Sequence, residues 1–145
     1  MIRPWNSLKI AGGLLAFFAV GHTFGTLNAG APEPAGQTVV DAMRTYHFQI
    51  MGSTRTFWDF YLGLNILLSV NLAALTIMSF QLASLSKTHP RRALPLTLTL
   101  GLACVLLAIP CWKYFFVAPA LSSTLAALAC AVAIYELRKV NPAGA

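Results

Sequence analysis

One stretch of this sequence places polar, ionisable and aromatic side chains at the beginning of a long apolar run. Residues 55–65 read RTFWDFYLGLN, so Asp59 lies among aromatic residues. A histidine, His22, lies near the C-terminal end of another apolar run. An ionisable side chain inside an apolar segment is costly unless it has a partner or a wet cavity. An acid and a histidine at similar depth would suit proton transfer, because burial and neighbouring charge can poise either group near neutral pH.

These patterns predict one polar site. We expect His22 and Asp59 to be its catalytic pair. The side chains expected to bind a ligand around them are Thr23, His47, Arg55, Trp58, Tyr61, Asn65, Trp112 and Lys113. A structural interpretation competes, in which Asp59 pairs with Arg55 at i, i+4 as an interfacial anchor. Nearby aromatic residues would then belong to the belt that membrane proteins place at the interface.

Haem and metal ions are alternative ligands for the same histidines. A bis-histidine haem site would use His22 and His47, and it requires the segment carrying His47 to dip inward. Metal binding by His22, His47 and Asp59 fits the residue types, but no close ligand spacing supports it. We therefore assign no metal site from the sequence.

The composition places these residues in an integral membrane protein. Of the 145 residues, 57% are hydrophobic and 10% are charged, whereas about a quarter are charged in a typical soluble domain. The net charge is +6, but the basic residues fall between apolar runs and not on one solvated face, which argues against a nucleic-acid partner. The three cysteines are odd in number and lie in apolar runs, so we expect free thiols. The lipid bilayer is the expected partner.

Four apolar segments are long enough to cross a bilayer, which requires about 20 residues. They cover approximately residues 8–27, 57–85, 94–112 and 119–137. Residues 37–51 show helical spacing of apolar side chains opposed by polar ones. We predict an all-α fold in a single transmembrane domain over residues 1–145, a four-helix bundle with a short interfacial helix in the first loop. The first segment also has the form of a cleavable signal peptide, but its length favours a retained helix.

The distribution of Lys and Arg predicts the orientation of these segments. One side of the membrane would carry Arg3, Lys9, Lys87, Arg91, Arg92, Arg138 and Lys139. The other side would carry Arg44, Arg55 and Lys113. Positive residues favour the cytoplasmic side, so we expect a multi-pass protein of the inner cell membrane with both termini in the cytoplasm. His22 and Asp59 would then lie on the outer side.

The segments GHTFG at 21–25 and RTFWDFYLG at 55–63 together resemble small bacterial four-helix membrane proteins, and the layout is similar to that of the DoxX-like group. This resemblance implies the architecture and no particular activity. A more distant similarity is to the EXPERA-type domain of sterol isomerases and sterol-binding receptors. In that domain, acidic and histidine side chains line a lipid-accessible cavity. The family presents several membrane acids where we assign only Asp59, so its isomerase residues are not carried over.

We therefore expect an outer-side intramembrane pocket that binds a small lipid-like molecule such as an isoprenoid, a quinone or a sterol-like compound. Acid–base chemistry by His22 and Asp59 would act on that ligand, and the sequence leaves open whether the protein is an enzyme. The competing hypothesis is a structural or accessory subunit, whose small-residue helix faces bind a second copy or a larger membrane complex. The third is a haem-binding electron-transfer protein.

Overall fold

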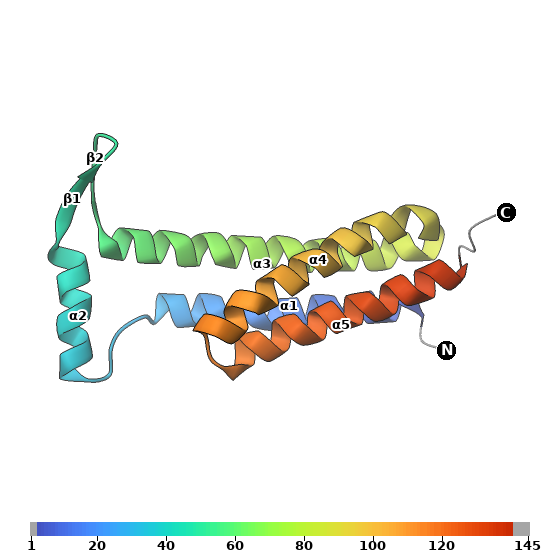
Figure 1. Ribbon diagram of the computed structural model, residues 1–145, viewed down its shortest axis with the longest axis horizontal. Helices are drawn as coiled ribbons and strands as arrows, with labels where there is room; N and C mark the ends of the chain where they lie inside the picture. Colours follow the sequence, from blue (N-terminus) through green and yellow to red (C-terminus); the bar gives the residue numbers. More distant parts are fainter. Residues whose placement is uncertain (1–2, 141–145) are drawn as a thin grey trace. The chain divides into compact units, whose positions relative to one another are not determined.

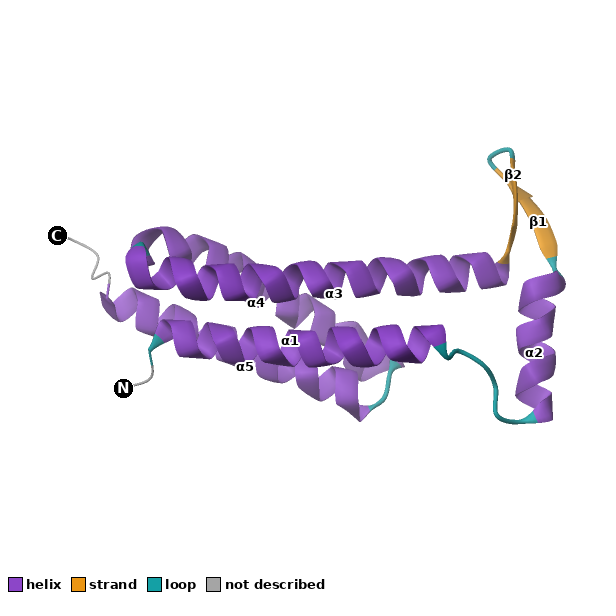
Figure 2. Cartoon of the chain, turned by 180° about the vertical axis from the view of Figure 1, so that it is seen from behind, coloured by secondary structure: helices purple, strands orange, loops and turns teal. Residues whose placement is uncertain are grey.

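The computed structural model describes residues 3–140. Within them the fold is all-α, as predicted, with five helices and one small hairpin (Figure 1). The helices are α1 (Pro4–Leu27), α2 (Pro34–Thr45), α3 (Phe57–Thr88), α4 (Pro90–Tyr114) and α5 (Val117–Val140). The hairpin consists of β1 (His47–Ile50) and β2 (Ser53–Thr56), which follow α2 directly (Figure 2).

Four helices in the described part of the chain, α1, α3, α4 and α5, are long and apolar enough to cross a membrane. They correspond to the four predicted segments; α4 and α5 extend beyond the predicted bounds at both ends, and α1 and α3 each at one end. Only 22–39% of the residues in the apolar window of each helix are buried inside the protein. Most of their apolar side chains therefore face outward, which suits a hydrocarbon environment.

Proline sets the start of several helices. Pro4, Pro34 and Pro90 each occupy the first position of their helix, where the missing N–H would have no intrahelical partner and the fixed φ already suits a helix. Pro95 and Pro110 lie inside α4, which is tolerated more readily in membrane helices than in soluble ones. The prolines at positions 4, 34 and 90 therefore mark the start of a helix, whereas the two prolines inside α4 mark no boundary.

The segment predicted as an interfacial helix over 37–51 has a different structure. α2 ends at Thr45, and residues 47–56 form an antiparallel pair in which His47 lies opposite Thr56. The chain reverses at Met51 and Gly52, whose φ values are +49° and +78°. Two successive residues with positive φ are typical of the two-residue turn of a tight hairpin. Methionine is unusual at such a position, so the sequence carries a weak turn signal.

The described chain forms two compact units. The first, called here the helical unit, contains the described residues up to Ala19 and from Leu72 onward. The second, called here the hairpin unit, contains Val20–Asn71, which includes α2, the hairpin, the end of α1 and the beginning of α3.

In the helical unit, the chain reverses direction at residues 115–116, between α4 and α5. These two helices pack against each other (Figure 1). Gly101 permits a close approach, because a Cβ atom there would lie 3.3 Å from the Cβ of Cys130. Cys104 of α4 and Cys130 of α5 are both fully buried. All three cysteines, including Cys111, are free, as the sequence predicts.

Buried hydroxyl groups inside this unit donate hydrogen bonds to backbone carbonyl oxygens. Ser79 of α3 donates a 2.7 Å hydrogen bond from Oγ to the backbone oxygen of Leu8 in α1. Thr97 donates from Oγ1 to Ala93 O within α4, at 2.8 Å. Both side chains are fully buried. Such bonds allow small polar residues to lie between apolar helices, where an unpaired hydroxyl would be costly.

Candidate functional site

An aromatic cluster attaches the hairpin to the first turns of α3. The ring of Phe48 in β1 lies 5.0 Å from that of Phe57 and 5.8 Å from that of Phe60. Tyr46 stacks on Phe57 with ring centroids 5.8 Å apart. Rings at these separations stabilise each other beyond the area they bury. A two-stranded hairpin is marginal by itself, so this cluster provides the support that holds the segment after α2 in place.

Thr56 and Asp59 form a capping box at the start of α3. The backbone N–H of Asp59 donates to Thr56 Oγ1 at 3.1 Å, and the backbone N–H of Thr56 donates to Asp59 Oδ2 at 2.8 Å. The first N–H groups of a helix have no partner within the helix, and this reciprocal pair satisfies two of them. Arg55 donates from Nη1 to Thr54 O at 2.8 Å. The structure thus gives Asp59 a helix-capping role different from the predicted pairing with Arg55.

His22 connects the end of α1 to α3. Its Nε2 atom lies 3.1 Å from the backbone oxygen of Asn65. Because a carbonyl only accepts, this contact requires the proton of His22 to be on Nε2. Thr26 donates from Oγ1 to His22 O at 2.9 Å, and Ser69 donates from Oγ to Asn65 O at 3.1 Å. These bonds fix the local register of the two helices.

Replacing His22 by alanine should destabilise the protein. Loss of the bond to Asn65 O should lower the free energy of unfolding by about 0.5–1.5 kcal/mol. Denaturant titration in mild detergent, followed by circular dichroism, measures this loss. Val20→Ala, at an exposed position on the same helix, is the matched control. A larger loss in Val20→Ala than in His22→Ala would contradict the assigned tie.

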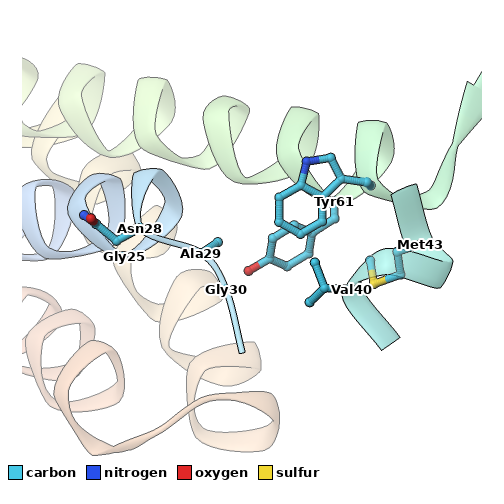
Figure 3. A pocket seen from close by; sticks show the side chains of 8 residues that line it. Gly25, Asn28, Ala29, Gly30, Val40, Met43 and Tyr61 are labelled. Atoms are coloured by element: carbon cyan, nitrogen blue, oxygen red, sulfur yellow. The ribbon is translucent and has the colours of Figure 1, made fainter. Parts of the chain in front are cut away.

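A cavity of about 420 Å³ lies within the hairpin unit (Figure 3). Its wall is formed by Gly25, Asn28, Ala29, Gly30, Val40, Met43, Trp58 and Tyr61. Figure 3 shows Tyr61 of α3 between the loop that follows α1 and the Val40 and Met43 side chains of α2. The rings of Trp58 and Tyr61 lie 5.3 Å apart. The side chains of the wall are therefore mainly apolar and aromatic, and their polar groups are the Tyr61 hydroxyl, the Trp58 indole N–H and the Asn28 amide, which donates to Phe24 O at 2.8 Å.

Arg44 lies over one wall of this cavity. Its Cζ atom is 4.3 Å from the ring centroid of Trp58, which is a cation–π contact. Arg44 is also in the last turn of α2, where a positive charge is favoured by the helix dipole. The Trp58 ring of the cavity wall thus has a guanidinium group over it, although Arg44 is not itself a lining residue.

The structure brings some of the predicted site residues together. Trp58 and Tyr61 line the cavity, and Asn65 follows one turn later, its Nδ2 donating to Tyr61 O at 2.7 Å. His22 and Asp59 are not among the lining residues, and both make the helix contacts described above. Thr23 is half-buried beside His22.

Other predicted site residues lie in different places. His47 is in β1 with its Nδ1 2.7 Å from Thr45 O, and Arg55 is in the facing strand. Trp112 and Lys113 belong to the helical unit. Trp112 donates from Nε1 to Thr124 Oγ1 of α5 at 3.0 Å, and the Nζ atom of Lys113 lies 5.0 Å from the ring centroid of Tyr114.

Several residues were not predicted from the sequence. The lining residues Val40 and Met43 lie on the apolar face of α2, and that face can be predicted from the spacing of apolar residues in the sequence. The position of Gly25 and Gly30 in the cavity wall cannot be predicted from their residue type. Glu136 is a second acid within a membrane-length helix. It is 7% exposed and pairs with Lys139, Oε1 to Nζ at 3.9 Å. Only Asp59 is assigned from the sequence as a membrane acid, although the predicted segment 119–137 contains Glu136.

Metal and haem binding receive no geometric support from the described residues. Within residues 3–140 there is no group of three or more His, Cys, Asp or Glu side chains that could hold a metal ion. A haem between His22 and His47 through Nε2 would require His22 to give up its bond to Asn65 O. That exchange would break the tie between α1 and α3, so the haem hypothesis carries a structural cost.

Comparison of the chain with protein families, with curated proteins and with solved structures gives no match. The resemblance to DoxX-like and EXPERA-type proteins therefore stays a prediction. Function must be inferred from the site itself.

Proposed function

We propose that this protein is a multi-pass membrane protein whose hairpin unit binds a small amphipathic molecule in the cavity beside Trp58 and Tyr61. In this proposal α1, α3, α4 and α5 cross the inner membrane, and both termini are cytoplasmic because most Lys and Arg residues then face inward. The observation that carries the proposal is the cavity of about 420 Å³ with an aromatic wall. Small-molecule sites commonly occupy about 300–1,000 Å³ and have mainly apolar walls.

The lining residues favour a lipid-like ligand such as an isoprenoid or a quinone. Val40, Met43 and the two aromatic rings offer apolar contact, and the exposed hydroxyl of Tyr61 offers a hydrogen bond to a polar end group. Binding, and not acid–base chemistry, is the function we propose, because His22 and Asp59 are engaged in helix contacts. Two glycines in the wall, Gly25 and Gly30, leave space that a side chain would fill.

A photoreactive long-chain alcohol tests the cavity. The purified full chain in lipid nanodiscs would be labelled with a diazirine derivative of the alcohol, and the modified peptides located by mass spectrometry. We expect labelling on the peptides that contain Val40 and Met43. Gly25→Leu should reduce it at least about tenfold, because Gly25 lines the cavity and the space around its Cβ position is open to the new side chain.

Gly21→Leu is the matched control. Gly21 lies one turn earlier on α1, also has open space around its Cβ position, and does not line the cavity. Both substitutions replace a helical glycine, which favours the helix. Equal labelling of the wild type and both variants would contradict the proposed binding site. The accessory-subunit hypothesis would then be the one to pursue.

A further inference from the structure

We propose that the ligand of this cavity carries an anionic oxygen-acid head group, a carboxylate or a phosphate monoester, which is bound by Arg44. This inference rests on the proposed function and adds the chemical class of the ligand. It comes from the position of Arg44 on the Trp58 ring, at 4.3 Å between Cζ and the ring centroid.

The contact with the Trp58 ring does not use the N–H donors of the Arg44 guanidinium. A guanidinium group that lies on an aromatic face is held by that face, while its N–H donors point outward in the plane of the group. Within residues 3–140, no hydrogen bond or ion pair engages the Arg44 guanidinium. Planar pairs of N–H donors match carboxylate and phosphate oxygens in a bidentate manner. The ring therefore positions a donor group that has no acceptor inside the described protein.

The acidic side chains of the hairpin unit do not pair with Arg44. Asp41 accepts a 2.9 Å hydrogen bond from Gln37 Nε2 through Oδ1, and Asp59 accepts the backbone N–H of Thr56. Glu33 is at the opposite end of α2 from Arg44. The second arginine of this unit, Arg55, donates to its own strand. Arg44 is thus the cation of the hairpin unit best placed to attract an anion to the cavity.

The size of the cavity favours a single apolar chain. A volume of about 420 Å³ is in the lower part of the usual range for small-molecule sites, and a two-chain phospholipid would have most of its apolar surface outside. The same Trp58 ring that supports Arg44 lines the cavity. In this proposal a head group on Arg44 lies at the edge of the cavity, next to Trp58, and its chain enters beside Val40 and Met43. Fatty acids and isoprenoid phosphates share this chemistry.

Paired probes test the inference. A diazirine fatty acid and the diazirine alcohol of the same chain length would label the wild type, Arg44→Gln, Arg44→Lys and the control Arg55→Gln in nanodiscs. We expect the acid to label the wild type more strongly than the alcohol. Arg44→Gln should reduce labelling by the acid at least about tenfold and leave labelling by the alcohol unchanged, which shows that the cavity is intact. Arg44→Lys should retain part of the acid labelling, and Arg55→Gln should retain all of it.

Competition distinguishes the two head groups. Unlabelled fatty acid and unlabelled long-chain alkyl monophosphate would each be added against the acid probe, and the stronger competitor identifies the preferred oxygen acid. Equal labelling by acid and alcohol, both lost in Gly25→Leu, would overturn the role of Arg44 and leave the proposed function standing. Labelling by both probes that is insensitive to Gly25→Leu would overturn the proposed function itself.

Discussion

Replacing Leu100 by alanine should lower the free energy of unfolding by about 2–5 kcal/mol. Leu100 is fully buried in α4, in the helical unit. Its truncation removes apolar contacts and leaves a cavity that neighbouring helices can fill only in part. Denaturant titration of the protein in mild detergent, followed by circular dichroism, measures the change.

Leu102→Ala provides the control for this prediction. Leu102 lies half a turn away in the same helix and is 59% exposed, so its side chain faces outward. The same atoms are removed in both variants, but Leu102→Ala should change stability little. Equal losses in the two variants would mean that α4 does not pack on the face that contains Leu100.

Replacing Thr56 by alanine should lower the free energy of unfolding by about 0.5–2 kcal/mol, the usual effect of losing an N-cap hydroxyl. The Asp59 N–H would lose its acceptor at the start of α3. The substitution should accelerate amide hydrogen exchange more in the first turn of α3 than in the middle of the helix. Thr56→Ser keeps the hydroxyl and should retain most of the protection.

Asp59 distinguishes a capping role from a catalytic or ligand-binding role. If Asp59 acts through the cap, then adding Asp59→Ala to Thr56→Ala should cost less than the sum of the two single changes, because both remove the same reciprocal pair. Labelling by the long-chain alcohol should persist in Asp59→Ala. Loss of labelling in a stably folded Asp59→Ala variant would instead assign the carboxylate to the ligand.

Much of the fold follows from hydropathy. Four long apolar runs separated by polar or proline-containing turns leave few alternatives to membrane-length helices, and the structure has helices at each of them. The hairpin was missed because apolar residues in 46–51 fit both helical and alternating spacing, and because Met51 is an unusual turn residue. The hairpin is stabilised by contacts between aromatic rings in β1 and α3. A pattern of residues within one short segment cannot predict such contacts.

The candidate site was predictable in part. Trp58 and Tyr61 stood out because aromatic residues at the start of an apolar run often face an interface or a ligand. The Thr56–Asp59 spacing is itself a capping-box signature, so the cap is readable from the sequence, whereas the apolar surroundings of Asp59 favour a buried acid. The cavity wall on the loop depends on where the chain passes after α1, which residue types alone do not determine.

The hairpin turn also has a practical consequence. Met51 is fully exposed at the tip of the hairpin, and exposed tips tolerate chemical change well. The three native thiols are buried. In a Met51→Cys variant the new thiol would therefore be more exposed to solvent than the native ones. A reagent that cannot cross lipid would then report, in intact cells, whether the hairpin faces the outside or the cytoplasm.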